Sequence, residues 1–232
     1  MENREEFYDY FLSVKKHMSK IKKFHIDDRF NDKKSVIGAF TTHDEVSPIL
    51  LKGPALSEMI IWLNATLPVD SYFVDGFQTG DDYNYKMGNK LAPATNTDDD
   101  MYFTHRGKID IFNFSRKPDG KNQTLRNDFL LGNNVKQSLL PTLNDGTFTP
   151  IKTKNPKVFA YTLGNSTKRV VVVGNLDFTN SVKTSVTIPK YNKRYNVLPI
   201  KISSMPDVNK HGKLSLNLQA GEIVVLIIHE LL

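Results

Sequence analysis

The first part of the chain alternates between helical and extended patterns of apolar residues. Apolar side chains recur at three- and four-residue spacing over residues 5–21 and 54–66, which predicts two helices with one apolar face each. Short β-prone apolar runs at 34–40 and 71–74 follow these helices and predict two strands. The order helix, strand, helix, strand is typical of a parallel α/β fold.

This regular pattern stops in the middle of the chain. From residue 78 to about 122, glycine, proline and aspartate interrupt the apolar positions, and a long loop of this kind in a compact domain is usually functional. A third helix is predicted over 125–140, with a weak point at Gly132 because glycine is a poor helix former.

After Asn144-Asp145-Gly146 the period changes from helical to extended. About seven short strand-like runs with turns between them predict a small antiparallel β-sandwich. These runs cover 147–151, 158–163, 169–176, 183–188, 195–200, 213–218 and 222–228. We therefore expect two domains, residues 1–145 and 146–232, of which the first is α/β and the second all-β.

Composition narrows the class of protein without identifying it. The hydrophobic content of 39% and charged content of 24% are ordinary for a soluble globular protein. Cysteine is absent, which excludes disulfides and thiolate metal sites. The net charge is +6, but the lysines are scattered among aspartates without a basic stripe, so we expect no nucleic-acid partner.

The N-terminal residues and the longest apolar run bear on where in the cell the protein is expected. The first six residues are charged and lack an apolar signal core, and the longest apolar run, 223–228, is too short to cross a bilayer. We expect a cytoplasmic protein with no membrane partner.

The candidate chemistry begins at the end of the first predicted strand. The apolar run 36–40 leads directly to His43 and Asp44 in a polar turn, and barrel strands present catalytic side chains at their carboxyl ends in this way. The alternative is that Asp44 caps the following loop and has no catalytic role. Asp81, Asp82 and Tyr83 would line a sugar subsite from the long loop, although packing within that loop is equally compatible with them.

Two other features are interpreted as structural. Asp98, Asp99 and Asp100 form a solvated acidic turn, because three consecutive carboxylates cannot all turn toward one ion. Trp62 falls on the second predicted helix and is assigned to the core or to an interface. No cofactor is expected.

Several tracts, in order, resemble the α-amylase family of glycoside hydrolases. Residues 40–44 read Phe-Thr-Thr-His-Asp and are similar to the family's Phe-x-x-Asn-His-Asp region at the end of barrel strand seven. Residues 63–68 are similar to its Leu-Thr-Leu-Pro-Gly stretch, and 72–76 to the tract of strand eight. Residues 139–161 and the Leu-x-Ala-Gly-Glu ending at 218–222 resemble its C-terminal β-domain. Thr42 and Gln78 depart from the pattern, where the family usually has Asn and an acidic residue.

The resemblance implies the last two strands and helices of a (β/α) barrel, followed by a C-terminal antiparallel β-sandwich. In that family Asp44 would be the third carboxylate, which stabilises the oxocarbenium-like transition state, and His43 would bind the same sugar. The nucleophile and general acid come from earlier barrel strands, so we expect this chain alone to be inactive.

The implied substrate is an α-glucan or maltooligosaccharide, and hydrolysis and transglycosylation are equally compatible with it. Two strands cannot close a barrel, so we expect one of three things: a cut or split gene, a partner chain that carries strands one to six, or self-association that covers the edge. The alternative function is a non-catalytic module that binds carbohydrate or a partner protein.

Overall fold

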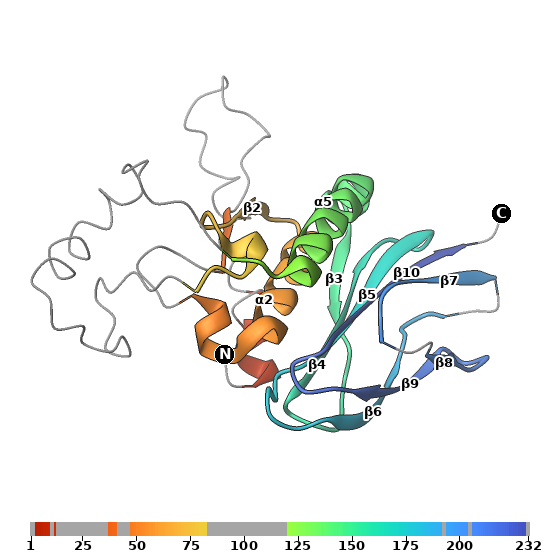
Figure 1. Cartoon of the computed structure of the whole chain (residues 1–232). Coiled ribbons are helices and arrows are strands. Elements are labelled where there is room, and N and C mark those ends of the chain that lie inside the picture. Colours follow the sequence, from red (N-terminus) through yellow and green to blue (C-terminus); the bar gives the residue numbers. More distant parts are fainter. Residues whose placement is uncertain are drawn as a thin grey trace, which may run out of the picture.

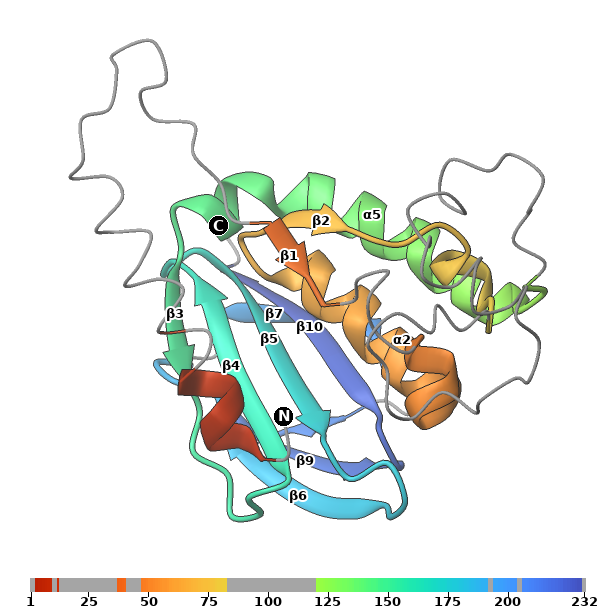
Figure 2. The ribbon, with the colours of Figure 1, turned by 90° about the vertical axis from the view of Figure 1, so that its left-hand side faces the viewer.

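The computed structural model describes residues 3–9, 12, 37–40, 47–82, 120–191, 194–203 and 206–230. Two long helices lie on one face of a five-stranded antiparallel sheet, and a three-stranded antiparallel sheet lies on the other face (Figure 1). A separate two-stranded parallel sheet lies on the helix side (Figure 2). The described part of the chain is thus mixed helix and sheet, and it contains no closed barrel.

The elements agree closely with the predicted pattern. The parallel pair consists of β1 (Ile37–Ala39) and β2 (Asp70–Tyr72), and the helices are α2 (Pro48–Thr66), the short 3₁₀ turn η2 (Phe77–Thr79) and α5 (Gln123–Asn144). The five-stranded sheet has the order β3 (Thr147–Pro150), β4 (Val158–Gly164), β5 (Lys168–Asn175), β10 (Ile223–Glu230), β7 (Tyr195–Lys201). The three-stranded sheet has the order β6 (Val182–Thr187), β9 (Lys213–Leu218), β8 (Asp207–Val208). Residues 4–9, the described start of the first predicted helix, are helical.

The five-stranded sheet is the middle layer of the molecule. Val170 and Val172 of β5 face the helices, whereas Val171 and Val173 face the three-stranded sheet. Every residue of β4 is buried for the same reason. Because both faces are covered, these strands read as continuous apolar runs and lack the alternation of a half-exposed strand.

Helix α2 begins earlier than the sequence predicts. It starts at Pro48, and a kink at Lys52 and Gly53 (φ 67°) separates its first turn from the segment that Pro54 opens. The predicted start at Pro54 is therefore the start of the second, straight segment, where proline suits the first turn. Trp62 on this segment is fully buried, which confirms its assignment to the core.

Helix α5 runs without a break through Gly132, where the sequence suggested a weak point. A Cβ on Gly132 would lie 3.0 Å from Cγ2 of Ile61 and 3.6 Å from Cβ of Ala65, both on α2. The absence of a side chain thus lets the two helices approach closely, which offsets the poor helix propensity of glycine. The Asn122 side chain accepts a hydrogen bond from Leu125 N at 3.1 Å and caps the helix.

The helices and the middle sheet share one apolar cluster. Trp62 and Leu125 belong to it together with Phe159 and Val225, so its members come from both sides of residue 145. The domain boundary at residue 145 stays a prediction. Lys201 of β7 strengthens the contact, since its Nζ lies 2.7 Å from Oδ2 of Asp128 on α5 and 3.1 Å from Oε2 of Glu58 on α2.

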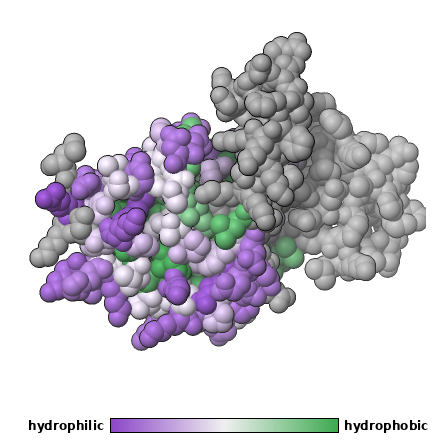
Figure 3. Space-filling model, turned by 180° about the vertical axis from the view of Figure 1, so that it is seen from behind, coloured by the Kyte–Doolittle hydropathy of each residue, from purple (hydrophilic) through white to green (hydrophobic). Residues whose placement is uncertain are grey.

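The surface of the described residues is mostly hydrophilic on the face shown in Figure 3, with small apolar patches between the polar groups. None of the described helices is long and apolar enough to span a membrane.

Candidate functional site at the carboxyl edge of the parallel strands

The two parallel strands end at the same edge. In the register of the pair Ile37 lies opposite Asp70, and Ala39 lies opposite Tyr72. The chain therefore leaves β1 at Phe40 and leaves β2 at Phe73 on the same side of the sheet. In parallel sheets this carboxyl edge is where binding and catalytic residues gather.

A tight turn built around η2 follows β2 and positions residues 77–81. Gly76 (φ 90°) and Gly80 (φ 68°) bracket η2, and both adopt left-handed conformations that favour glycine. Asp81 N donates a hydrogen bond back to Gly76 O at 3.0 Å. The turn thus folds residues 77–81 back over the end of β2.

Two of the five predicted site residues lie in this turn. Asp81 is buried and Asp82 is exposed. His43, Asp44 and Tyr83 lie outside the described residues, so their roles and their distances from Asp81 remain predictions. The predicted strand within 109–114 and the acidic run 98–100 also lie outside them.

A hydrogen bond links the two segments that carry the candidate residues. Ser47 Oγ donates to Asp81 O at 3.2 Å, and Ser47 is the first described residue after the stretch 41–46. Ile49, in the first turn of α2, has its Cδ1 3.6 Å from the position of a Cβ on Gly80. The return of the chain into α2 is therefore anchored directly on the turn that carries Asp81.

The long loop also returns to this turn. Asn122 N donates to Thr79 O at 2.9 Å. A Cβ on Gly120 would lie 2.5 Å from both Asp81 N and Thr79 O, so only glycine fits without displacing the backbone. Residues 82 and 120, between which the undescribed part of the loop lies, are consequently held beside each other.

Sequence reasoning missed Ser47, Gly76, Gly80 and Gly120 as organising residues. Of the two glycines that bracket η2, Gly76 gave a detectable signal, since the Asp-Gly pair marks a turn. Ser47 and Gly120 gave none, because their importance depends on contacts with residues far away in the sequence.

A buried lysine supports the parallel pair from behind. Lys136 Nζ on α5 donates hydrogen bonds to Asn64 O and Leu67 O at the carboxyl end of α2, which leads directly into β2. Burial lowers the pKa of Lys136 to about 8, and the charge of Asp70 opposes that shift in part. Lys136 is therefore a structural cation that caps α2.

Within the described residues no group of three histidine, aspartate or glutamate side chains is placed to hold an ion. On the turns beyond the two parallel strands the Asp82 side chain is exposed, whereas Asp81 is buried and the Ser47 hydroxyl is bonded to Asp81 O.

Comparisons with known proteins show a likeness of fold. No family model and no curated protein matches the chain in sequence. Among solved structures, the chain has the fold of part of α-amylase-family enzymes, which confirms at the level of fold the resemblance that the motifs indicate.

Three of these structures define the likeness. Amy13B of Eubacterium rectale superposes with a TM-score of 0.58 at 13% identity and covers 99% of this chain and 44% of its own. The maltogenic α-amylase AmyB of Thermotoga neapolitana gives 0.54 at 11%, covering 98% and 49%. The Nostoc punctiforme debranching enzyme, in crystals soaked with acarbose, gives 0.51 at 17%, covering 80% and 32%. The chain thus spans between a third and a half of the length of these proteins.

Proposed function

We propose that this chain is the C-terminal part of an α-amylase-family enzyme that hydrolyses or transfers α-glucosidic linkages in glucans. In this proposal β1 and β2 are the last two strands of a (β/α) barrel, and the two antiparallel sheets are the C-terminal β-sandwich. The boundary between these two parts lies at residue 145.

The parallel pairing of β1 and β2 carries the proposal. A parallel pair connected through a helix is the repeating unit of a barrel, and its carboxyl edge is where such enzymes act. The tracts that resemble the family at strands seven and eight, residues 40–44 and 72–76, lie at the carboxyl ends of β1 and β2. Shortly after each tract, the chain segments meet where Ser47 Oγ donates a hydrogen bond to Asp81 O. The similar solved structures are named as carbohydrate-active enzymes: a debranching enzyme, a trehalose-6-phosphate hydrolase and a maltogenic α-amylase.

In this proposal the residues take the roles that the family resemblance implies. Asp44 stabilises the oxocarbenium-like transition state with its negative charge, and His43 donates a hydrogen bond to a hydroxyl of the same sugar. Asp82 and Tyr83 bind neighbouring sugar units through hydroxyl contacts and ring stacking, whereas Asp81, which is buried, holds the turn that carries them through its backbone hydrogen bonds. The nucleophile and the general acid are supplied from outside this chain.

The exposed surfaces of the parallel pair suggest how the site is completed. Every residue of β2 is exposed, and Ile37 of β1 is 64% exposed. Parallel strands occur almost only in sheets covered on both faces. We therefore infer that further parallel strands, from another polypeptide or from a longer form of this one, pair with β1 and β2.

Calorimetric titration with maltoheptaose tests the proposal. We expect weak binding that the variants Asp44→Asn and His43→Ala each reduce at least tenfold, because both remove groups that contact the sugar. Asp145→Asn, an exposed aspartate at the end of α5, is the matched control and should bind like the wild type. Binding unchanged in Asp44→Asn and His43→Ala would contradict the assignment.

A turnover assay tests the missing catalytic groups separately. The purified chain should release no reducing ends from maltooligosaccharides. Hydrolysis that survives repurification and is abolished by a substitution in this chain would show that the nucleophile and acid lie within it.

A further inference from the structure

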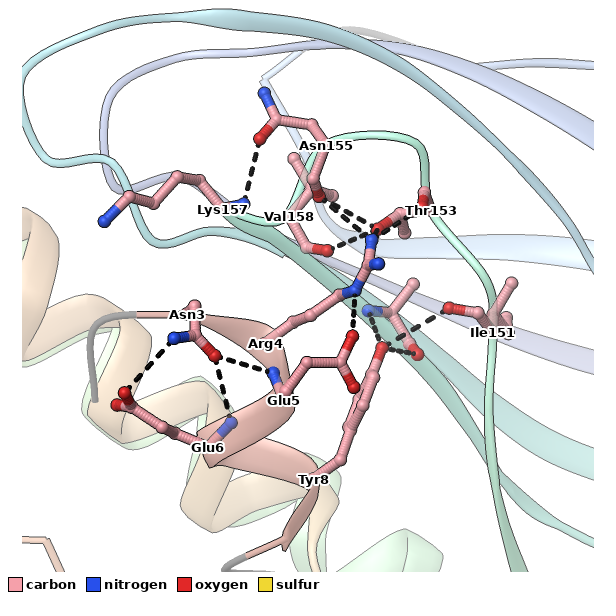
Figure 4. Close-up of polar contacts among 11 residues, drawn as sticks. Asn3, Arg4, Glu5, Glu6, Tyr8, Ile151, Thr153, Asn155, Lys157 and Val158 are labelled. Carbon is pink, nitrogen blue, oxygen red and sulfur yellow. Dashed lines mark hydrogen bonds and ion pairs between the residues drawn. The ribbon is translucent and has the colours of Figure 1, made fainter.

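Arg4 and Arg169 both place a guanidinium beside the β-sheets, but the two cations are satisfied differently. Arg4 Nη1 donates to the Thr153 carbonyl at 2.6 Å and to the Asn155 carbonyl at 3.2 Å. Its Nε lies 2.6 Å from Oε1 of Glu5 (Figure 4). The Arg4 cation thus has carbonyl oxygens and a carboxylate around it, although its side chain is still 22% exposed.

Arg169 on β5 is more deeply buried and has fewer partners. It is 7% exposed, and its Nε is buried without a hydrogen-bond partner. Nη2 donates to the Lys190 carbonyl at 3.3 Å, which is the only hydrogen bond of this guanidinium within the described residues. No carboxylate of the described residues forms an ion pair with it. A guanidinium stays charged in proteins, and a buried charge without a counter-ion is costly, so the described residues leave the Arg169 charge uncompensated.

Aromatic rings hold the Arg169 guanidinium at one end of the space between the two antiparallel sheets. Val171 faces the three-stranded sheet, and the alternation of a strand puts Arg169 on the same face. Its Cζ lies 5.1 Å from the centroid of the Tyr195 ring, whose hydroxyl donates to Ser166 O at 2.8 Å. The Tyr191 ring lies 5.9 Å from that of Tyr195. Because the donors of a guanidinium lie in its plane, a ring over its face leaves them unused.

Nη1 is the atom through which a ligand from solvent can reach this charge. It makes no hydrogen bond within the described residues and, unlike Nε, is not enclosed. The charge of a guanidinium is delocalised over its nitrogens, so an anion at Nη1 compensates all of it. Lys190 in the adjoining loop and Arg194 before β7 are both exposed and basic, whereas Glu230, opposite Tyr195, is the acidic residue of this end. The local excess of positive charge favours an anion with more than one negative charge.

We propose that Arg169 anchors an anion-binding site at this end of the two antiparallel sheets, and that the ligand carries a phosphate group. Arginine binds phosphate oxygens through charge-assisted hydrogen bonds, and a phosphate group carries close to two negative charges, which suits the basic surroundings better than a carboxylate does. The phosphate supplies to Arg169 the counter-charge that Glu5 supplies to Arg4. This site lies on the face of the middle sheet away from the helices, and it does not depend on the proposed function.

NMR titration of the full chain tests the binding, with inorganic phosphate replacing chloride at constant ionic strength. The backbone amides of Lys190 and Tyr195 should shift along one saturable curve, and acetate should bind at least fivefold more weakly. Arg169→Met should weaken phosphate binding at least tenfold, whereas Arg126→Met, at an exposed arginine on α5, is the matched control and should bind like the wild type. A parallel titration with glucose 6-phosphate shows whether a phosphate ester or free phosphate binds more tightly.

Three results of this titration would overturn the proposal. The first is the absence of a saturable shift in the wild type with either phosphate compound. The second is an equal response of the same amides in Arg169→Met. The third is acetate binding as tight as that of phosphate, which would remove the assignment of a phosphate group.

Thermal unfolding gives a second readout, which a purely structural role of Arg169 would not produce. Phosphate at about ten times its half-saturating concentration should raise the melting temperature of the wild type by about 3 °C and leave that of Arg169→Met unchanged. Without phosphate, the variant should melt no more than about 3 °C below the wild type, because removal of an uncompensated buried charge offsets the lost contacts. A larger fall, or failure of the variant to fold, would show that Arg169 stabilises the fold without an anion and would also overturn the proposal.

Discussion

The five-stranded sheet and the parallel pair solve the problem of burial in opposite ways. Strands β4 and β5 are covered on both faces, by the helices and by the three-stranded sheet. β2 is exposed at every position, and Ile37 and Tyr72 of the pair are 64% and 40% exposed. The sheet layer therefore makes up most of the buried core of the described residues, whereas the parallel pair is largely exposed.

Replacement of a tyrosine in each region should show the largest difference. Tyr161→Ala on β4 removes a fully buried ring whose hydroxyl is hydrogen-bonded to Thr66 Oγ1, and we expect it to lower the free energy of unfolding by about 4 kcal/mol. Tyr72→Ala on β2 should cost about 1 kcal/mol or less. Urea unfolding measures both, and equal losses would contradict the contrast between the two regions.

The pH dependence of stability should reveal the buried lysine that links them. The folded-state pKa of Lys136 is about 8 and its unfolded value is about 10.4, so the unfolded chain binds more protons between these values. Its contribution therefore stabilises the folded state as pH rises from about 8, by at most about 3 kcal/mol. Burial raises the pKa of Tyr161, which destabilises the folded state above about pH 10. The effect of Lys136 on stability should therefore be measured below that pH.

The measurement is urea unfolding of the wild type and Lys136→Met at pH 7.5 and 9.5. The stability of the wild type relative to the variant should increase between these two values. Lys121→Met, an exposed lysine, should show no such trend relative to the wild type. A difference between the wild type and Lys136→Met that stays constant with pH would mean that Lys136 titrates normally.

The contact between the long loop and the turn after β2 is tested by a pair of glycine variants. Gly120→Ala places a Cβ 2.5 Å from Asp81 N and should cost about 2 kcal/mol, because backbone must move. At Gly53 nothing lies within 4 Å of the added Cβ, so Gly53→Ala should cost only backbone strain, roughly 1–3 kcal/mol, because φ 67° with ψ −164° is essentially restricted to glycine. Amide exchange of residues 79–82 should accelerate only in Gly120→Ala. Unchanged exchange there would show that the turn does not need this contact.

The smallest expected effect concerns the ion pairs between the sheet and the helices. Burial of Lys201 alone would lower its pKa. The nearby carboxylates of Asp128 and Glu58 outweigh that effect, so the pKa of Lys201 is raised. Lys201→Met leaves these carboxylates facing each other and should cost about 1.5 kcal/mol. Lys183→Met on the exposed face of β6 should change stability by less than about 0.5 kcal/mol. Similar stabilities for the two variants would show that the bridge contributes little.

Local pattern was enough to predict most of the fold. The strands after residue 146 were located within one or two residues, because turns separate clear apolar runs. The two-residue strand β8 was missed, since so short a run has no period. The kink at Lys52 and the contact at Gly132 depend on how the helices meet, and single-sequence periodicity carries no information about that.

The candidate site was predicted only in part, for a related reason. The sequence indicated which residues follow the two parallel strands, because strand ends are local features. It did not indicate that Ser47 reaches the backbone of Asp81 or that Gly120 closes on the same turn, because both contacts form only when distant segments meet.

Backbone NMR titration with maltoheptaose tests the central claim most directly, since it locates the ligand on the chain. The account predicts shift changes confined to the carboxyl edge of the parallel pair, at residues 38–47 and 72–83, and their loss in Asp44→Asn. Shift changes confined to residues 146–230, unaffected by Asp44→Asn, would contradict it and would favour a carbohydrate-binding module built on the two antiparallel sheets.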